Sequence, residues 1–225
     1  GPFPDSAIAS VFREIISASL SLESPVKVAF LGPIATFSHL ACLQRFGASV
    51  SELPSDSIKG VFDAVERGQA DFGVVPIENS TEGVVNHTLD LFVGSPLKIY
   101  GEFFLEVQHY LLSKADTLEK IKRVYSHPQP LAQCASFLET NFPNVPLIEV
   151  ASTAIATQYC QEDASASAIA SEIASKIYQV PILKHRIEDN ARNITRFLVI
   201  SKKMPAPTGA DKTSVIVSIK DQPGA

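Results

Sequence analysis

One stretch in the first half of the chain changes abruptly from apolar to polar. Residues 72–77, Phe-Gly-Val-Val-Pro-Ile, are too few for a typical helix and suit a short buried strand. Four polar residues follow it directly: Glu78, Asn79, Ser80 and Thr81. Open α/β sheets bind small molecules just beyond the carboxyl ends of their strands, so this pattern predicts a ligand site at the polar loop. The alternative is that the same residues only cap a following helix.

Short apolar runs and helical patterns alternate through residues 26–201. The expected strands are 26–31, 72–77, 123–125, 147–150, 167–169, 182–187 and 195–201, with one or two more in 98–112. The expected helices are 8–23, a helix from Thr36 or Ser38 through Gln44, 58–67, 84–92, 128–140, 153–160 and 171–178. This alternation predicts an α/β fold with mainly parallel sheets. Two such runs joined by a long crossing indicate two lobes with a cleft between them, and one continuous sheet is the alternative.

Charge and composition exclude several classes of partner. The chain has 19 Lys and Arg against 24 Asp and Glu, a net charge of -5, which disfavours nucleic acid as a partner because phosphate binding needs a basic face. It lacks a membrane span of roughly 18 apolar residues and, in residues 1–10, the basic start of a secretory signal. Three widely spaced cysteines, Cys42, Cys134 and Cys160, fit a reduced core. We therefore expect a cytoplasmic protein.

Two further polar segments also follow expected strands. Ser126, together with the free N–H groups of the helix beginning near Pro128, would suit a carboxylate, and Gln133 lies one to two turns inside that helix. Ser152 and Thr153 open another helix and are either a simple cap or a second anion site.

The last expected strand begins with a threonine and an arginine. Arg196 is a natural bidentate partner for a carboxylate, and a surface ion pair with Glu188 or Asp189 is the alternative. Thr195 is alternatively a plain β-branched strand residue. The sequence has no metal-ligand cluster, phosphate loop or Rossmann glycine fingerprint, so we expect chemistry without a cofactor or metal.

Taken together, these segments resemble the prephenate dehydratase family over about residues 26–201. The blocks that carry the resemblance are Leu31-Gly-Pro with Thr36-Phe-Ser38, Gly73 to Ser80 with Glu82-Gly83, Ser126 to Gln129 with Ala132 to Cys134, Ser152 to Ala154, and Asn193 with Thr195 to Phe197. The resemblance implies a two-lobed fold of the type II periplasmic-binding-protein kind. It also implies conversion of prephenate to phenylpyruvate. The chain departs from the family at Ile34-Ala35, where an acid and a glycine are usual.

The resemblance also implies roles for individual residues. Thr195 would donate a hydrogen bond to the departing hydroxyl, and Glu78 would relay a proton if it is kept protonated. Substrate binding is implied for Thr36, Asn79, Ser80, Ser126, Gln133, Ser152, Thr153, Arg196 and Phe197. For Phe197 the alternative is a plain core position.

By the same resemblance, the chain looks like the dehydratase core of a longer, regulated enzyme. The implied segments are 1–24 as the last helix of a chorismate mutase domain, 25–201 as the dehydratase domain, 202–211 as a linker and 212–225 as the start of an ACT domain. Lobe 1 would take about 25–103 and 186–201, and lobe 2 would take about 104–185. We expect L-phenylalanine to regulate the full-length protein only, and that protein to be a homodimer or larger. A non-catalytic metabolite sensor of the solute-binding type is the alternative function.

Overall fold

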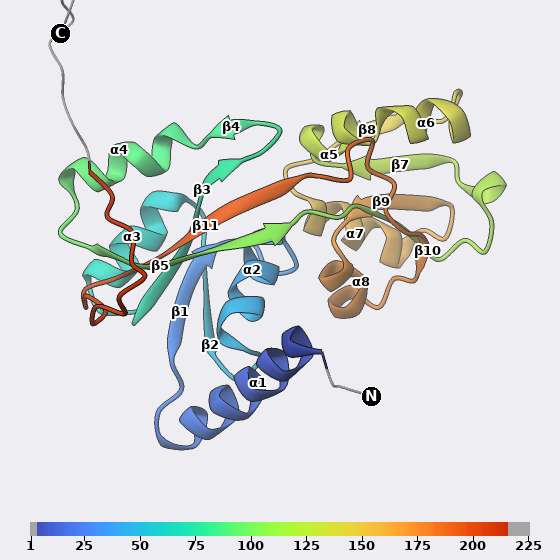
Figure 1. Ribbon diagram of the computed structural model, residues 1–225. Helices are drawn as coiled ribbons and strands as arrows, with labels where there is room; N and C mark the ends of the chain where they lie inside the picture. Colours follow the sequence, from blue (N-terminus) through green and yellow to red (C-terminus); the bar gives the residue numbers. More distant parts are fainter. Residues whose placement is uncertain (1–3, 216–225) are drawn as a thin grey trace, which may run out of the picture.

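Two β-sheets, each with helices packed against it, divide the protein into two lobes (Figure 1). This computed structural model describes residues 4–215. The sheet of lobe 1 has the strand order β2-β1-β3-β11-β5, with β4 paired to β3, and the sheet of lobe 2 has the order β10-β6-β9-β7-β8. The chain therefore passes from lobe 1 into lobe 2 and returns.

Lobe 1 combines the first half of the chain with its last described strand. Its strands are β1 (Lys27–Leu31), β2 (Ser51–Ser55), β3 (Phe72–Asn79), β4 (Gly83–Val84), β5 (Lys98–Glu106) and β11 (Ile194–Ser201). Its helices are α1 (Asp5–Glu23), α2 (Phe37–Phe46), α3 (Ile58–Glu66) and α4 (Asn86–Gly94). One core cluster packs α2 against Val28, Phe30 and Phe197, while a second packs α3 against Leu198 and Ile200. Helices thus cover both faces of this sheet, and successive residues of β11 enter different cores.

Lobe 2 is a continuous segment of the chain. Its strands are β6 (Tyr110–Ser113), β7 (Arg123–Ser126), β8 (Leu147–Glu149), β9 (Ala166–Ala170) and β10 (Ile182–Lys184). Its helices are η1 (Leu118–Lys120), α5 (Pro128–Gln133), α6 (Ala135–Asn141), α7 (Thr153–Glu162) and α8 (Glu172–Tyr178). All five residues of β9 are buried, because clusters on both faces pack against this central strand.

The predicted α/β architecture is confirmed, but the sheets are mixed rather than mainly parallel. β1 pairs in parallel with β2 and β3, and β7 with β8 and β9. β11 is antiparallel to β3 and β5, and β6 is antiparallel to β9 and β10. The antiparallel strands β5, β6, β10 and β11 flank the two crossings between the lobes. Each of these antiparallel pairs contains β6 or β11, and these two strands enter their sheets directly from the other lobe. They are not reached through a helical crossover, which is the connection that makes neighbouring strands parallel.

Several expected boundaries differ from the structure. Strand β2 was not predicted, because its polar residues and Pro54 hide an edge strand. The polar loop was predicted to begin at Glu78, but β3 continues through Asn79. The helix expected over 128–140 breaks at Cys134. Of the segment 212–225, which the resemblance implies is the start of an ACT domain, residues 212–215 are irregular, and residues 216–225 lie outside the described residues.

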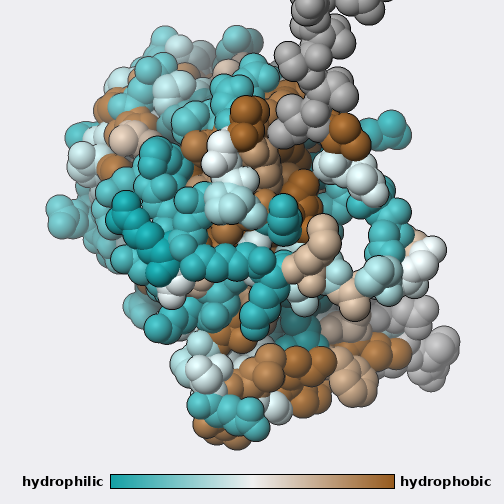
Figure 2. All heavy atoms as spheres, turned by 90° about the vertical axis from the view of Figure 1, so that its left-hand side faces the viewer, coloured by the Kyte–Doolittle hydropathy of each residue, from teal (hydrophilic) through white to brown (hydrophobic). Residues whose placement is uncertain are grey.

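Helix α1 lies against the end of α2 and leaves much of its apolar surface exposed. Its Ser17 Oγ accepts from the Ser49 backbone N–H at 3.2 Å, and Glu14 accepts from the Ala48 N–H at 3.0 Å. Its exposed apolar side chains range from 40% to 88% exposure: Ile8, Val11, Phe12, Ile15, Ile16, Leu20 and Leu22. Figure 2 shows hydrophobic atoms gathered at the lower end of the molecule, where α1 lies in Figure 1. Even so, within residues 4–215 no helix combines the length and hydropathy needed to cross a membrane.

Two segments, 107–109 and 185–193, cross between the lobes side by side. The Val107 N–H donates to the Asn193 carbonyl at 2.8 Å, and the Ile187 N–H donates to the His109 carbonyl at 3.0 Å. A third contact comes from lobe 1, where Ala35 is fully buried in a core cluster of lobe 2 and has a φ of 70°. That backbone conformation favours glycine, the residue that is usual in the family where this chain has Ala35.

Candidate active site

The pairing of β3 with β11 decides which predicted site residues meet. Thr195 lies opposite Asn79, and Arg196 lies opposite Glu78. The register then shifts, and Ile77 is left without a partner in β11. Such a bulge interrupts the alternation of side chains and re-aims those that follow. Consequently Asn79 shares a face with Thr195, while neighbouring Glu78 points with Arg196 to the opposite face.

Asn79 is the best-connected polar side chain of this site. Its Oδ1 accepts from the backbone N–H groups of Thr81 and Glu82 at 2.9 and 3.0 Å. Its Nδ2 donates to Asn193 Oδ1 and to Thr195 Oγ1, each at 2.8 Å. Because a backbone N–H can only donate, these bonds fix the amide with its oxygen toward the loop and its nitrogen toward Thr195.

The bond from Asn79 leaves the Thr195 hydroxyl proton available. Thr195 Oγ1 accepts from Asn79, and within residues 4–215 it has no recorded acceptor for its own proton. A hydroxyl that accepts a hydrogen bond becomes a better donor, since chains of hydrogen bonds polarise one another. The half-buried Thr195 is therefore arranged to donate to a bound group.

A chain of amides continues from Asn79 into lobe 2. Asn193, which is only 2% exposed, donates from Nδ2 to Gln133 Oε1 at 3.0 Å. Gln133 in turn donates from Nε2 to Glu82 Oε1 at 3.1 Å, and its Oε1 lies 2.8 Å from His109 Nε2. The structure thus brings Asn79, Thr195 and Gln133 into one network that joins the two lobes.

Ser80 and Thr36 use their hydroxyls to hold local backbone. Ser80 Oγ donates to the Arg192 carbonyl at 3.0 Å and accepts from the Ile194 N–H at 2.9 Å. Thr36 donates to the Pro33 carbonyl at 2.9 Å and caps α2. Each hydroxyl proton is thereby committed within the protein, so a substrate would have to compete for it.

The start of α5 differs from the predicted carboxylate site. Ser126 is fully buried, and its hydroxyl donates to the Ile169 carbonyl at 2.7 Å. Pro128 and Pro130 have no N–H, and the Gln129 N–H lies 3.3 Å from the ring nitrogen of its capping residue, His127. The expected row of free N–H groups is therefore missing at this helix start, because two prolines remove donors and a side-chain cap takes another.

The start of α7 combines a cap with a buried threonine. Ser152 Oγ accepts from the Ile155 N–H at 3.2 Å, which is an ordinary N-cap bond. Thr153 is buried, with 6% exposure. These contacts account for both residues as part of the helix start, and their predicted contact with substrate stays a prediction.

Arg196 and Glu78 belong to a separate charge cluster. Arg196 Nε donates to Glu102 at 2.8 Å, and its Nη1 lies 3.7 Å from Glu78 Oε2. Lys212 also contacts Glu102, and hydrogen bonds from Lys212 and Arg196 lower the pKa of this carboxyl against the opposing effect of burial. Arg196 therefore pairs with Glu102 and Glu78 rather than with Glu188 or Asp189, and the structure does not bring it or Glu78 to the Thr195 hydroxyl.

Phe197 is a core residue in this structure. It is 2% exposed and stacks on Phe103 at a centroid distance of 5.6 Å. That burial fits the alternative interpretation, a plain core position, and leaves little surface for a ligand.

Thiols and metal ligands contribute little to the site. Burial raises the pKa of Cys42 and of Cys160 to about 12 each, and that of Cys134 also rises, so none is a ready nucleophile. Across residues 4–215 no three His, Cys, Asp or Glu side chains gather as metal ligands would. The available chemistry is that of a hydroxyl set among amides.

Three network residues had no predicted role at the site. Asn193 and Glu82 lie within the blocks that carry the family resemblance, so their proximity to the site residues was a usable signal. His109 stands alone before an apolar strand, and only its three-dimensional position next to Gln133 reveals it.

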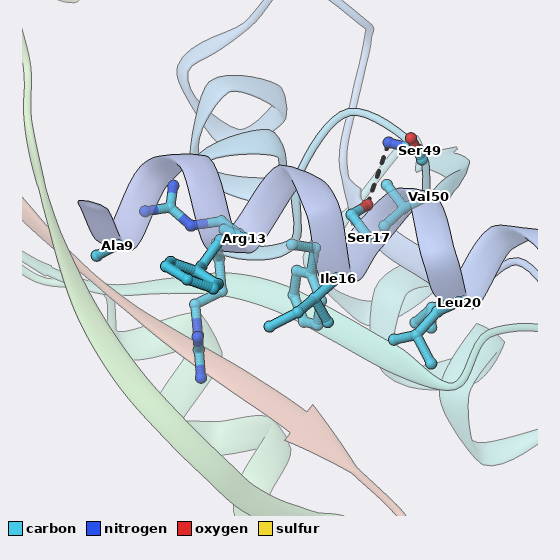
Figure 3. A pocket seen from close by; sticks show the side chains of 11 residues that line it. Ala9, Arg13, Ile16, Ser17, Leu20, Ser49 and Val50 are labelled. Carbon is cyan, nitrogen blue, oxygen red and sulfur yellow. Dashed lines mark hydrogen bonds between the residues drawn. The ribbon is translucent and has the colours of Figure 1, made fainter. Parts of the chain in front are cut away.

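One cavity of about 460 Å³ lies far from this network, along α1 (Figure 3). Ile16, Leu20 and Val50 line it together with Arg13 and Arg45. Its walls are mostly apolar and carry none of the predicted site residues, so we do not assign the reaction to it.

Comparisons with known proteins agree on one family. Residues 28–205 match the family model described as prephenate dehydratase. The whole chain is 52% identical to a protein of Aquifex aeolicus (strain VF5) named bifunctional chorismate mutase/prephenate dehydratase, and covers 62% of that protein. The chain thus spans less than two thirds of this relative's length.

Two solved structures resemble this chain to a similar degree. Prephenate dehydratase from Arthrobacter aurescens in complex with L-Phe aligns with a TM-score of 0.74 and 31% identity, over 84% of this chain and 63% of that one. A structure described as a novel type of quorum-quenching acylase aligns with a TM-score of 0.71 and 30% identity, over 80% of this chain and 65% of that one. Since the family model covers most of the chain and full-length identity to a curated relative reaches 52%, the chain belongs to the prephenate dehydratase family.

Proposed function

We propose that this chain catalyses the decarboxylating dehydration of prephenate to phenylpyruvate. The observation that carries the proposal is the Thr195 hydroxyl, whose oxygen accepts from Asn79 and whose proton is free to donate. Family membership supplies the reaction, and this geometry supplies a donor suited to it.

The reaction needs help at one atom above all. The bond from the ring to its carboxylate breaks, carbon dioxide leaves, and the electron pair enters the ring. The ring carbon–oxygen bond then breaks, the ring becomes aromatic, and the departing hydroxide takes up a proton from solvent to form water. In our proposal Thr195 Oγ1–H donates to that departing oxygen, and a preorganised donor of this kind contributes roughly 10² to 10³ in rate.

The structure supports a revised division of roles. Asn79 orients Thr195, and Gln133 belongs to the same network, so both are proposed to border the substrate. Thr36, Ser80, Ser152 and Thr153 are proposed to shape the surrounding loops. Because Glu78 and Arg196 pair on the opposite face, the proposed mechanism uses neither Glu78 as a proton relay nor Arg196 as a carboxylate clamp.

An acylase reaction fits this site less well. Acyl transfer by a hydroxyl requires a base within hydrogen-bond reach of the nucleophile. The recorded neighbour of Thr195 Oγ1 is the Asn79 amide nitrogen, which donates and does not take up a proton. The site therefore favours a hydrogen-bond donor over a nucleophile.

The test is to incubate the chain with prephenate and to measure phenylpyruvate against an enzyme-free control. We expect turnover by the wild type, a roughly 10²- to 10³-fold lower kcat for Thr195→Val, and substantial activity for Thr195→Ser, which keeps the hydroxyl. Wild-type protein that folds but forms no phenylpyruvate would reject the function. A folded Thr195→Val variant with unchanged kcat would reject the role of Thr195.

We further propose that the full-length protein is cytoplasmic, also carries chorismate mutase and ACT domains, and responds to L-phenylalanine. Curated relatives are named as bifunctional enzymes, and one solved relative is in complex with L-Phe. Calorimetric titration of L-phenylalanine into the full-length protein tests the effector. Absence of binding there would reject it.

A further inference from the structure

His109 is a buried residue that lies where the chain crosses between the lobes. Its side chain is 1% exposed, and its ring meets Phe37 of α2 edge-on at 5.3 Å. Its backbone N–H donates to Glu188 Oε2 at 2.9 Å, and its carbonyl accepts from the Ile187 N–H at 3.0 Å. Contacts from both lobes therefore hold this imidazole in place.

The donor directions of the network follow from its two ends. At one end, the Thr81 and Glu82 N–H groups can only donate, so Asn79 must turn its nitrogen toward Asn193. Asn193 then accepts with its oxygen and donates with its nitrogen to Gln133. At the other end, the Glu82 carboxylate accepts from Gln133 Nε2. Both ends impose the same direction, so the intervening amides have one consistent orientation.

This direction sets the proton position on His109. Gln133 Oε1 lies 2.8 Å from His109 Nε2 and can only accept, so Nε2 must carry the hydrogen. The other ring nitrogen, Nδ1, is buried and has no hydrogen-bond partner among residues 4–215. A charged ring would place a second donor there without an acceptor. Burial accordingly lowers the pKa of His109, which favours the neutral ring.

We propose that His109 is a positioning residue for Thr195. Its Nε2–H holds Gln133 Oε1, Gln133 holds Asn193, and Asn193 helps to keep the Asn79 amide turned so that Thr195 accepts and retains its proton for the substrate. The inference rests on the proposed function, and it adds a residue that itself touches no reacting atom.

The kinetic test compares two substitutions of His109 in the 225-residue chain. His109→Leu removes the donor, and we expect kcat to fall roughly 10- to 100-fold with little change in KM, because the loss is one of orientation. His109→Gln places an amide nitrogen near the position of Nε2, and we expect it to restore most of that loss. His185→Gln is the matched control, since the exposed His185 contacts Tyr110 and lies outside the network.

Two kinetic outcomes would overturn the proposal. One is a folded His109→Leu variant whose kcat lies within about 2-fold of wild type, which would mean that His109 is not needed to position Thr195. The other is a His109→Gln variant as slow as His109→Leu, which would assign the effect to packing alone.

A spectroscopic test does not depend on turnover. In nitrogen-15 spectra at neutral pH we expect the His109 ring to be neutral with its proton on Nε2. We also expect the Asn79 side-chain amide signals to shift in His109→Leu but not in His185→Gln. A charged ring, a proton on Nδ1, or unmoved Asn79 signals would reject His109 as a positioning residue. This outcome does not depend on activity, because a wild type that is inactive on prephenate would reject the proposed function and not the hydrogen-bond network.

Discussion

Asn79→Asp would reverse the donor direction at Thr195 while keeping the shape of the side chain. One carboxylate oxygen would still accept from the Thr81 and Glu82 N–H groups. The other would replace Nδ2, which now donates to Asn193 and Thr195 at 2.8 Å. Because a carboxylate only accepts, the Thr195 hydroxyl would turn its proton toward it and away from the substrate.

The contacts give the expected loss of stability and the expected loss of kcat in Asn79→Asp. The new oxygen faces Asn193 Oδ1 in a buried position, where an unsatisfied polar group costs about 1–3 kcal/mol. Flipping the Asn193 and Gln133 amides would move the conflict to Gln133, which would then turn its oxygen toward the exposed Glu82 carboxylate and its NH2 toward His109 Nε2–H, and each lost hydrogen bond costs about 1 kcal/mol. We therefore expect a stability loss of about 1–3 kcal/mol. Loss of the aimed donor should lower kcat by roughly 10² to 10³.

The assay is a double-mutant cycle of Asn79→Asp and Thr195→Val, with kcat measured at saturating prephenate and folding checked by urea unfolding. Using kcat separates the effect from weaker binding of an anionic substrate near a new negative charge. If Asn79→Asp already turns the hydroxyl away, removing that hydroxyl should slow the double variant by less than about 3-fold further. The reasoning would be refuted if the fold-losses in kcat of the two single variants multiplied in the double variant. A near-normal kcat in folded Asn79→Asp would refute it as well.

Two further predictions concern stability. Ala35→Val should lower the free energy of unfolding, measured by urea denaturation, by at least about 2 kcal/mol, since a β-branched residue is strained at a φ of 70° and this side chain is fully buried, whereas Ala35→Gly should stay within about 1 kcal/mol of wild type. A valine variant as stable as wild type would contradict the strained geometry. Glu102 has a lowered pKa when folded, so its contribution is present above its usual value of 4.5 and is lost as pH falls through the lower folded value. As pH falls from roughly 6 to 3, the free energy of unfolding should therefore decrease less in Glu102→Gln than in wild type. The same decrease in both proteins would count against the Lys212 and Arg196 contacts.

The sequence was sufficient for most of the fold because its strands and helices have clear periods. The run before Glu78 and the alternation in residues 123–178 produced elements near their predicted places. Strand β2 was missed because Pro54 and its polar neighbours resemble a loop, and tertiary pairing with β1 overrides that local pattern.

The site was harder to predict, because residue type does not reveal the face of a sheet. Thr195 and Arg196 are adjacent in sequence and both polar, yet Thr195 belongs to the amide network and Arg196 to the separate charge cluster on the opposite face. The bulge at Ile77 that brings Asn79 to Thr195 leaves no mark in the apolar pattern of β3. His109 could not be identified because its partner Gln133 lies on another element, and only the folded lobes bring the two together.

The position of β11 has a consequence for how the protein is made. This strand inserts between β3 and β5, although the whole of lobe 2 separates it from them in the chain (Figure 1). On the ribosome, residues 110–184 emerge and can complete the second sheet while β3 and β5 still expose unpaired edges. The contact between Asn79 and Thr195 then forms only when β11 is released and docks. A nascent chain halted before residue 194 would hold a finished lobe 2 but not the Asn79–Thr195 pair of the proposed site, so the onset of the proposed activity during synthesis would report the final folding step.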